Sequence, residues 1–481
     1  MTVIGRDLAA IRAARVAAEP EADLVELRLD SMTRPDPDGA MAGRTRPVIV
    51  TCRPLREGGM FDGSEEERLR ILTRAHELGA EFIDVEWDAA AGPLIRARAG
   101  RGVIVSRHDF AGTPANAAEV LAGLRSVGGE IAKLAVTTER PSDLLALLHA
   151  VPQDGSSIVI GMGGAGMATR ILAERFGSRW TYAGNAIAPG QITAARLQQE
   201  FRFRRIRPDA EVYVVIGRPV TSSLSPAMHN AGFAALGLNA AYVPLDVRDL
   251  GGLRELGGAI GLRGASVTIP FKRQLSDVLD DMAPTAAAAG AVNTIAVRDG
   301  RWIGMNTDAD GFLEPLRARV PDLRGVRAVI LGAGGAARGV GLALRREGAD
   351  VAIAARRAEA AGMVAEAIDV RTSAWPPPSG SWDLLVNATP VGSRAVPGAP
   401  YAGAFDGRLV YDLVYDPDPT ELMTAAAARG CVVIGGLAML VAQAERQFEI
   451  WTGRRPPAGL FAEAAASAIQ TRSVAEESRF A

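Results

Sequence analysis

Lysine is nearly absent from this chain of 481 residues, and the two lysines present are the first candidates for chemistry. Lysine and arginine together number 53, yet only Lys133 and Lys272 are lysines. A guanidinium stays protonated in proteins, whereas a lysine amine can lose its proton, form a Schiff base or relay protons. Both lysines lie in apolar sequence, in Ile131–Val136 and at the end of Val267–Lys272. Chance survival of two surface lysines is the alternative, but these flanking residues favour two chemical roles.

Several polar residues in the first half could form one site with Lys133. A lysine in apolar surroundings is more easily deprotonated, because burial disfavours the charged form, and the neutral amine is a nucleophile. His108 could act as a general acid or base, and Glu57 could orient it. Three arginines could hold a substrate carboxylate: Arg28, Arg53 and Arg170. The alternatives are a structural role for His108 and a salt bridge between Glu26 and Arg28.

The elements around these residues alternate between strands and helices over the first 200 residues. The seven predicted strands are Leu24–Leu29, Val48–Arg53, Phe82–Trp87, Gly102–Asp109, Ile131–Thr137, Ser157–Met162 and Trp180–Gly184. Amphipathic segments between them, such as Glu65–Leu78 and Pro141–Leu148, predict helices and therefore a parallel sheet. With a short strand at Thr2–Ile4, the pattern predicts an α/β fold that begins with a (β/α)₈ TIM-type barrel. The polar candidates cluster at or just after strand ends, where such barrels place their active sites.

These motifs resemble type I 3-dehydroquinate dehydratase over about residues 5–200. The matching pieces are Glu26–Asp30, Thr51–Gly59, Ser106–Phe110, Lys133, Met162, Arg170 and Ala188–Gln191. The resemblance implies that Lys133 forms an imine with the substrate ketone and that His108, positioned by Glu57, removes a proton in a syn elimination of water. It also implies five substrate-binding residues: Glu26, Arg28, Arg53, Arg170 and Gln191. The chain departs from the family at Ile187, where a serine is usual, and in its short first strand.

A glycine-rich turn in the second half predicts a nucleotide site. Gly332-Ala-Gly334-Gly335 follows an apolar strand and opens a helix, so phosphates could approach the backbone and the helix N-terminus. The next predicted strand, Asp350–Ala354, is followed by Arg356 and Arg357 and not by an acid. Arginines at this position suit a 2′-phosphate, so NADP is favoured over NAD. A tight turn and generic surface arginines are the alternatives.

The second half also resembles shikimate dehydrogenase, over about residues 211–470. The matching pieces are Ile216–Asn230, Val267–Lys272, Gly290–Thr294, Asn306–Asp308 and Gly435–Gln443. The resemblance implies that Lys272 and Asp308 are the catalytic pair, although a structural ion pair would look the same in sequence. The implied substrate-binding residues are Ser223, Ser225, Thr268, Asn293, Tyr415 and Gln443, with helix N-capping as the alternative for the serines. The implied cofactor-binding residues are Gly332, Gly334, Gly335, Ala336, Arg356, Arg357, Thr389 and Gly436. The family's Asn-Arg-Thr cofactor motif is replaced by Ala355-Arg356-Arg357.

Together the two halves resemble a bifunctional fusion that catalyses consecutive steps. The predicted domains are a dehydratase barrel at 1–206, a substrate-binding domain at 211–310 with C-terminal helices at 437–470, and a Rossmann-type NADP-binding domain at 311–436. The expected reactions are dehydration of 3-dehydroquinate and NADPH-dependent reduction of 3-dehydroshikimate to shikimate. One alternative keeps only the dehydrogenase active, with the barrel as a degraded structural module. Another is a dehydrogenase that acts on quinate.

Composition excludes several other classes of protein. The formal net charge is −2 and no basic block is long enough to bind nucleic acid. Cys52 and Cys431, the two cysteines, lie far apart, so neither a disulfide framework nor a metal cluster is expected. A secretory signal and an uncharged apolar run of about 18 residues are absent, so no membrane span is expected. We therefore expect a cytoplasmic enzyme with small-molecule substrates.

Overall fold

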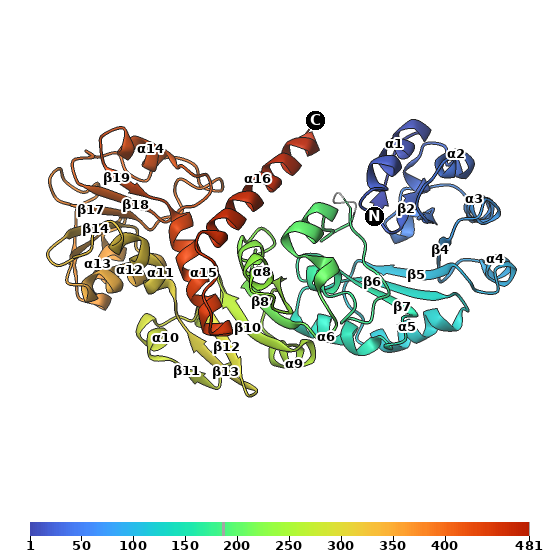
Figure 1. Cartoon of the computed structure of the whole chain (residues 1–481), viewed down its shortest axis with the longest axis horizontal. Coiled ribbons are helices and arrows are strands. Elements are labelled where there is room, and N and C mark those ends of the chain that lie inside the picture. Colours follow the sequence, from blue (N-terminus) through green and yellow to red (C-terminus); the bar gives the residue numbers. More distant parts are fainter. Residues whose placement is uncertain (185–187, 481) are drawn as a thin grey trace. The chain divides into compact units, whose positions relative to one another are not determined.

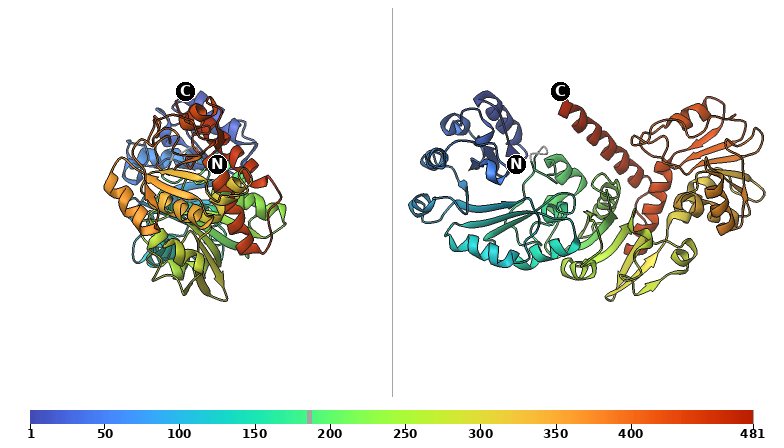
Figure 2. Two further views of the ribbon diagram at one scale, coloured as in Figure 1. Left: turned by 90° about the vertical axis from the view of Figure 1, so that its left-hand side faces the viewer. Right: turned by 180° about the vertical axis from the view of Figure 1, so that it is seen from behind.

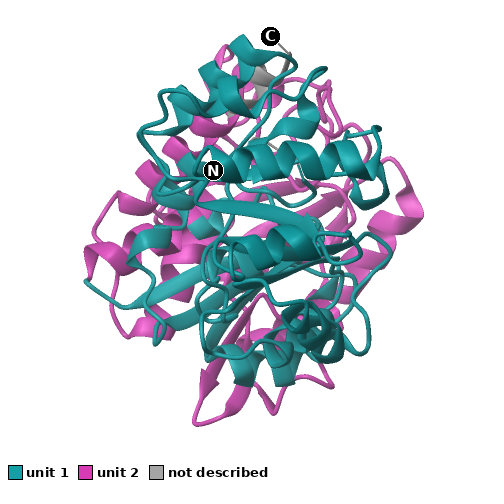
Figure 3. Ribbon diagram, turned by 90° about the vertical axis from the view of Figure 1, so that its right-hand side faces the viewer, with its two compact units in different colours: residues 1–226, 237–271 teal, residues 227–236, 272–481 magenta. Residues whose placement is uncertain are grey.

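The computed structural model describes residues 1–184 and 188–480, with side chains described as far as Arg472. Ile187, the predicted departure from the dehydratase pattern, lies outside the described residues. Contacts divide the chain into two compact units (Figure 3). The first comprises Met1–Pro226 and Gly237–Phe271, and the second comprises Ala227–Leu236 and Lys272–Ala481. The predicted boundary between residues 206 and 211 therefore falls inside the first unit.

The first unit contains a parallel sheet whose seven strands follow one another in sequence order (Figure 1). The strands are β1 (Thr2–Val3), β2 (Val25–Arg28), β3 (Val48–Thr51), β4 (Phe82–Glu86), β5 (Val103–Asp109), β6 (Ile131–Thr137) and β7 (Ser157–Met162). The helices are α1 (Leu8–Ala18), α2 (Pro37–Met41), α3 (Glu65–Glu77), α4 (Gly92–Ala97), α5 (Ala117–Ser126), α6 (Pro141–Ala150) and α7 (Met167–Ile171). Figure 2 shows cyan helices lying along one face of these strands. This is the predicted TIM-type α/β architecture.

The predicted strand at Trp180–Gly184 is not a regular strand. Ser178 and Ala183 each form only an isolated bridge, Ser178 with Ser157 of β7. The backbone N–H of Thr2 in β1 donates to the carbonyl oxygen of Ala183 at 2.8 Å. Residues 178–183 thus connect the last strand of the sheet to the first. A physical reason for the irregularity is that β1 has only two residues, too few to form a regular ladder of backbone hydrogen bonds with residues 180–184.

Alternation along the strands decides which side chains face the interior of this sheet. An apolar cluster fills part of that interior: Ile49, Ile104, Ile131, Ala135, Ile158, Ile160 and Tyr182. Because successive side chains point to opposite faces, Lys133 shares the face of Ile131 and Ala135 on β6. Ser106 and His108 likewise follow Ile104 on β5. The two-residue alternation that points the apolar cluster into the interior therefore also points the candidate catalytic side chains there.

The rest of the first unit packs on the barrel. It holds three parallel strands with β8 in the middle: β8 (Glu211–Gly217), β9 (Ala240–Asp246) and β10 (Leu262–Val267). Helix α9 (Leu253–Ile260) packs against α6, and α7 packs against β9. Arg175 donates to the main-chain oxygens of Pro208 and Ala210 at 2.6 Å each, and also to that of Ile260. These contacts explain why β8–β10 belong to the same compact unit as the barrel.

The second unit contains a smaller set of strands and a Rossmann-type sheet. The first set is β11 (Asp281–Met282), β12 (Thr294–Arg298) and β13 (Arg301–Met305), with α10 (Pro284–Ala289) and α11 (Asp308–Arg317). The Rossmann-type sheet has the order β16-β15-β14-β17-β18-β19 and is parallel throughout. Its strands are β14 (Arg327–Leu331), β15 (Asp350–Ala354), β16 (Arg371–Thr372), β17 (Leu384–Asn387), β18 (Leu409–Asp412) and β19 (Val432–Ile434). The helices are α12 (Gly335–Arg346), α13 (Ala358–Ile368), α14 (Glu421–Ala427), α15 (Gly436–Thr452) and α16 (Leu460–Phe480), and α8 (Ser225–Ala235) is divided between the units.

The Rossmann-type sheet is covered on both faces, which its sequence explains. Ala328 and Ile330 of β14 pack with residues of α12 and α13. Val329 and Leu331 of the same strand pack in a second cluster with residues of α14. A parallel strand buried on both faces needs a continuous apolar run, and β14 provides one. Across residues 1–184 and 188–480, no helix combines the length and apolar character needed to cross a membrane.

Candidate active sites

The predicted residues of the first half lie around one cavity of about 120 Å³ inside the first unit. Its lining includes all eight of the predicted catalytic and substrate-binding residues: Glu26, Arg28, Arg53, Glu57, His108, Lys133, Arg170 and Gln191. Tyr182 and Met162 also line it. Strands β2, β5, β6 and β7, the segment after β3 and helix α7 bring most of these side chains together from positions far apart in sequence.

Lys133 is buried, as the sequence predicts, and it has two close partners. Its Nζ donates to Asp84 Oδ2 at 2.9 Å and lies 4.4 Å from the centroid of the Tyr182 ring. A carboxylate and an aromatic face both stabilise a positive charge. The site is therefore built to hold a cation at the nitrogen of Lys133.

Asp84 is the centre of a buried ionic network that the sequence motifs do not reveal. Its carboxylate also contacts Arg53 Nη2 at 2.9 Å and accepts from Ser106 Oγ at 2.6 Å. Arg53 Nη1 in turn donates to Glu86 Oε1 at 2.6 Å. Burial alone would raise the pKa of Asp84, but Arg53 and Lys133 hold it well below its usual range. In the sequence, the one sign of this network is that Asp84 and Glu86 alternate with apolar residues in β4.

Glu57 and His108 form the predicted pair. Glu57 Oε2 lies 2.9 Å from His108 Nδ1 and accepts from the backbone N–H of His108 at 3.1 Å. Burial raises the pKa of Glu57 to about 7, against the opposing effect of Arg53. Burial, together with Arg53 and Lys133, lowers the pKa of His108 well below its usual value. His108 is therefore neutral near pH 7, and a neutral imidazole can accept a proton.

The three predicted carboxylate-binding arginines are not equivalent. Arg28 forms a bidentate pair with Asp30 at 2.8 and 2.7 Å, and Arg53 is held by Asp84 and Glu86. Arg170 is 2% exposed, and its one hydrogen bond within the described part of the chain is to the carbonyl oxygen of Tyr182 at 3.5 Å. Burial lowers the pKa of Arg170 to about 10. A buried cation without a carboxylate partner favours an anionic ligand in the adjacent cavity.

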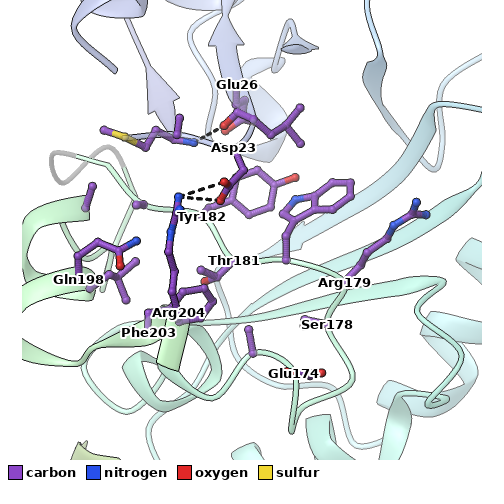
Figure 4. Close-up of a pocket in the computed structure, with 18 of the residues that line it drawn as sticks. Asp23, Glu26, Glu174, Ser178, Arg179, Thr181, Tyr182, Gln198, Phe203 and Arg204 are labelled. Atoms are coloured by element: carbon purple, nitrogen blue, oxygen red, sulfur yellow. Dashed lines mark hydrogen bonds and ion pairs between the residues drawn. The ribbon is translucent and has the colours of Figure 1, made fainter. Parts of the chain in front are cut away.

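A larger cavity of about 850 Å³ lies elsewhere in the first unit (Figure 4). Asp23, Thr181, Gln198 and Arg204 are among its lining residues, and Arg204 pairs with Asp23 at 2.9 Å. Of the eight predicted dehydratase residues, all of them described, Glu26 alone is in its lining. We therefore assign the dehydratase chemistry to the smaller cavity, where the titratable groups converge.

The predicted catalytic pair of the second half is formed in the second unit. Lys272 Nζ donates to Asp308 Oδ2 at 2.6 Å, and both side chains are 32% exposed. Asn293 Nδ2 donates to the other oxygen of Asp308 at 2.7 Å. Asp308 opens α11, so its backbone N–H lies at a helix start and donates to Asn306 Oδ1 at 2.9 Å. The aspartate is thus fixed from three sides, while the lysine remains open to solvent.

The other predicted shikimate-binding residues are distributed over both units. Ser223, Ser225 and Thr268 belong to the first unit, and Asn293, Tyr415 and Gln443 belong to the second. Ser223 Oγ accepts from the backbone N–H of Ser225 at 3.2 Å, where α8 begins. The bond spans two residues, as in a serine turn, and fixes the Ser223 hydroxyl just before the helix. It does not exclude substrate binding, because one hydroxyl can accept and donate hydrogen bonds at the same time.

The glycine-rich turn has the shape that a dinucleotide needs. Gly332 has φ +114°, and a Cβ there would lie 3.0 Å from Thr389 Cγ2. Nothing lies within 4 Å of a Cβ at Gly334 or Gly335, and both glycines and Ala336 are open at the start of α12. Arg356 and Arg357 are exposed just after β15. An open backbone at a helix start with nearby cations fits the phosphates of NADP.

Two further cofactor candidates are fixed by their surroundings. Thr389 Oγ1 donates to Asn387 Oδ1 at 2.7 Å, and Asn387 Nδ2 donates to the buried Asp412 at 2.8 Å. A Cβ at Gly436 would lie 2.3 Å from the carbonyl oxygen of Leu413, so this start of α15 requires glycine. Asp412 is absent from the predicted site residues, yet it holds the end of β17 beside the glycine-rich turn.

Comparison with known proteins gives the same division of the chain into two activities. Family models match residues 1–208 (type I 3-dehydroquinase), residues 215–295 (shikimate dehydrogenase substrate binding domain) and residues 436–465 (shikimate 5′-dehydrogenase C-terminal domain). The bifunctional 3-dehydroquinate dehydratase/shikimate dehydrogenase of Arabidopsis thaliana, named as chloroplastic, is 34% identical over 485 residues, covering 92% of this chain and 80% of the relative. The chain belongs to this bifunctional family.

Relatives of the second half support the assignment to shikimate dehydrogenase. The NADP(+) shikimate dehydrogenase of Citrifermentans bemidjiense is 42% identical over 278 residues, covering 53% of this chain and 95% of the relative. A crystal structure of shikimate dehydrogenase in complex with NADP+ is 34% identical with a TM-score of 0.51, covering 55% of this chain and 96% of that chain. The Rossmann-type unit therefore has a structural counterpart that binds NADP+.

The raised pKa of Glu57 predicts the pH dependence of dehydration. Below about pH 7 the Glu57 carboxyl becomes protonated and loses the negative charge that holds the Nδ1 proton of His108 and stabilises the imidazolium formed in the reaction. We expect kcat/KM for 3-dehydroquinate to fall tenfold per pH unit below about 7 and to level off above it. The pKa of His108 lies too low to produce this inflection. In Glu57→Gln the inflection near pH 7 should disappear, and a variant that keeps it would contradict the assignment.

Proposed function

We propose that this chain dehydrates 3-dehydroquinate to 3-dehydroshikimate in the first half and reduces 3-dehydroshikimate to shikimate with NADPH in the second. The observation that carries the proposal is that both catalytic sets are complete in one chain. Lys133, His108 and Glu57 converge on one cavity, and Lys272 pairs with Asp308. Two free, buried cysteines, Cys52 and Cys431, suit a reducing compartment, and we place both reactions in the cytoplasm.

In the first reaction, Lys133 passes a proton to neutral His108 and attacks the substrate ketone as the neutral amine. The ketone oxygen takes up one proton from the amine nitrogen and one from His108, leaves as water, and a protonated imine remains. The protonated imine carries the positive charge that Asp84 and the Tyr182 ring already face in the free enzyme. Because the charge is preserved, the surroundings need little reorganisation as the imine forms. The imine withdraws electrons from the neighbouring carbon, and neutral His108 removes a proton there. His108 then gives this proton to the substrate hydroxyl, which leaves as water, and hydrolysis of the imine releases the product.

Arg170 and Glu57 supply orientation in this scheme. Arg170 is the buried cation without a carboxylate partner among the described residues, so we propose that it binds the substrate carboxylate. Glu57 holds His108 through Nδ1 and leaves Nε2 to accept the proton. Glu26, Arg28, Arg53 and Gln191 complete the wall of the cavity.

In the second reaction, NADPH supplies the hydride when bound. Lys272 donates a proton to the carbonyl oxygen of 3-dehydroshikimate as negative charge develops there. Asp308, fixed by Asn293 and Asn306, keeps the Lys272 ammonium in place and polarises it. The hydroxyls of Ser223, Ser225 and Thr268 provide the hydrogen bonds that a polyhydroxylated acid requires. We expect the glycine-rich turn and Arg356 to hold the phosphates of NADPH.

The two alternatives make different predictions in one substrate panel. A degraded barrel would leave 3-dehydroquinate unchanged, although the buried network around Lys133 is intact in the structure. A quinate dehydrogenase would oxidise quinate with a higher kcat/KM than shikimate. We expect shikimate to be the preferred substrate.

A coupled assay tests the proposal directly. Wild-type enzyme given 3-dehydroquinate and NADPH should consume NADPH and form shikimate. Lys133→Arg should form none from 3-dehydroquinate, because arginine offers no neutral amine, yet it should still reduce 3-dehydroshikimate. Borohydride added with 3-dehydroquinate should trap an adduct that mass spectrometry locates at Lys133. Dehydration that persists without any adduct at Lys133 would exclude the imine.

Removal of Lys272 should affect only the second reaction. We expect Lys272→Ala to lower the rate of 3-dehydroshikimate reduction by about 10²–10⁴, the usual effect of losing a catalytic proton donor. Dehydration should stay within a few-fold of wild type, because the Lys272–Asp308 pair and the Lys133 cavity lie in different units. Loss of both activities in a folded variant would show that the two sites are not chemically independent.

Cofactor preference tests the role of Arg356. NADPH should be preferred over NADH, and Arg356→Ala should weaken NADPH binding by roughly tenfold to a hundredfold, as expected for loss of a charge-assisted hydrogen bond. The KM for NADH is the internal control, because NADH lacks the 2′-phosphate and should bind the variant as it binds wild type. Equal kcat/KM for the two cofactors in wild type would refute the assignment.

A further inference from the structure

The loop that carries Ser223 is held by side chains at its start, and one of them comes from the dehydratase half. This loop, residues 218–224, lies between β8 and α8, and both the loop and the side chains that hold it belong to the first unit. We propose that Arg196, a residue of the dehydratase half, is a positioning residue for shikimate binding by the dehydrogenase. The proposal rests on the proposed function, in which Ser223 and Ser225 bind the substrate.

The Arg196 side chain forms a hydrogen bond to the main chain of the loop. Its Nη2 donates to the carbonyl oxygen of Thr221 at 3.1 Å. The guanidinium is oriented by a bidentate pair with the buried Glu200, at 2.7 Å from Nε and 3.0 Å from Nη2. A charge-assisted bond from a pre-oriented guanidinium fixes a carbonyl in direction as well as position. Arg196 is therefore a rigid anchor at Thr221.

Asp246, at the end of β9, supplies a second anchor one residue earlier. Its Oδ2 accepts from the backbone N–H of Val220 at 2.8 Å. The side chain of Asp246 also packs on Gly164 of the barrel, where a Cβ would lie 2.9 Å from Asp246 Cβ and Cγ. Gly164 follows β7, and its neighbour Gly163 donates to the carbonyl oxygen of Pro189 at 3.3 Å. The barrel thus also supports the aspartate that holds Val220.

These anchors determine where the substrate-binding serine lies. The backbone N–H of Ser223 donates to the carbonyl oxygen of Val220 at 3.0 Å, and Ser223 Oγ accepts from Ser225 N. The turn that presents the hydroxyl of Ser223 is therefore built directly on Val220 and Thr221. Releasing the carbonyl of Thr221 should let the turn shift while Lys272 and Asp308 keep their geometry. The expected effect is weaker binding of shikimate with little change in the chemical step.

The chain provides a matched control for a merely structural role. Arg175 also belongs to the barrel and also donates to main-chain carbonyl oxygens of the neighbouring strands and helix, those of Pro208, Ala210 and Ile260. Those carbonyls lie before β8 and at the end of α9, at the amino ends of β8 and β10. The loop with Ser223 follows the carboxyl end of β8. Loss of Arg175 should therefore loosen the same packing without moving the serine.

The experiment compares full-length wild type, Arg196→Ala, Arg196→Lys and Arg175→Ala in shikimate oxidation with saturating NADP+. We expect Arg196→Ala to raise the KM for shikimate by about three- to tenfold, a partial effect of losing one charge-assisted bond, with kcat and the KM for NADP+ within twofold of wild type. Arg196→Lys can still donate to Thr221 and should recover part of the loss. Arg175→Ala should lower the Tm but leave the KM for shikimate unchanged.

Four results would contradict the expectation, and they separate failure of this proposal from failure of the proposed function. An unchanged KM for shikimate in folded Arg196→Ala would overturn the proposal, and so would an equal rise in Arg175→Ala, which would indicate general loosening. A fall in kcat without a rise in KM would also overturn it, because the effect would then lie in the chemical step. Wild-type enzyme that fails to oxidise shikimate would instead refute the proposed function.

Discussion

The ion pair between Lys133 and Asp84 is the interaction on which the dehydratase site depends. Both side chains are buried, and the same carboxylate binds Arg53 and Ser106. Removing one member of such a network leaves the other charges buried without a partner, which costs about 3–5 kcal/mol. The network therefore holds three strands of the barrel in register and defines the electrostatics of the cavity. Asp84, which pairs with Lys133 in the free enzyme, would also face the positive charge of the proposed imine.

The two sites use lysine under different physical conditions. Lys133 lies in a closed interior, where a carboxylate and an aromatic face surround its nitrogen. Lys272 is about one third exposed beside Asp308. A nucleophile that bonds to its substrate must be held in one position, whereas a proton donor to a reduced carbonyl must be resupplied from solvent. The near absence of lysine elsewhere in the chain is consistent with arginine serving as the general surface cation.

The barrel and strands β8–β10 are joined by side-chain contacts as well as by the continuous chain. Arg175, Arg196 and the α6–α9 contact join the dehydratase half to β8–β10 and to the loop with Ser223. These strands of the dehydrogenase half therefore have the barrel as part of their support. The barrel can support the loop with Ser223 while the two lysines act independently. Arg196 and Asp246 contact that loop, and the described hydrogen bonds of these two side chains do not involve Lys272 or Asp308.

The sequence alone determined the class of fold and most of the chemical groups. Period-two alternation places Lys133 on the face of Ile131 and Ala135, and the glycine-rich turn before α12 specifies an open backbone, so both follow from local rules. The prediction of a regular strand at Trp180–Gly184 is wrong: the structure shows isolated bridges there, because β1 is too short to offer a full ladder. Only the tertiary structure decided the partners: Asp84 for Lys133, Asp30 for Arg28, and no described carboxylate for Arg170. Pairing between side chains tens of residues apart depends on strand order and register, which no local pattern of residues encodes.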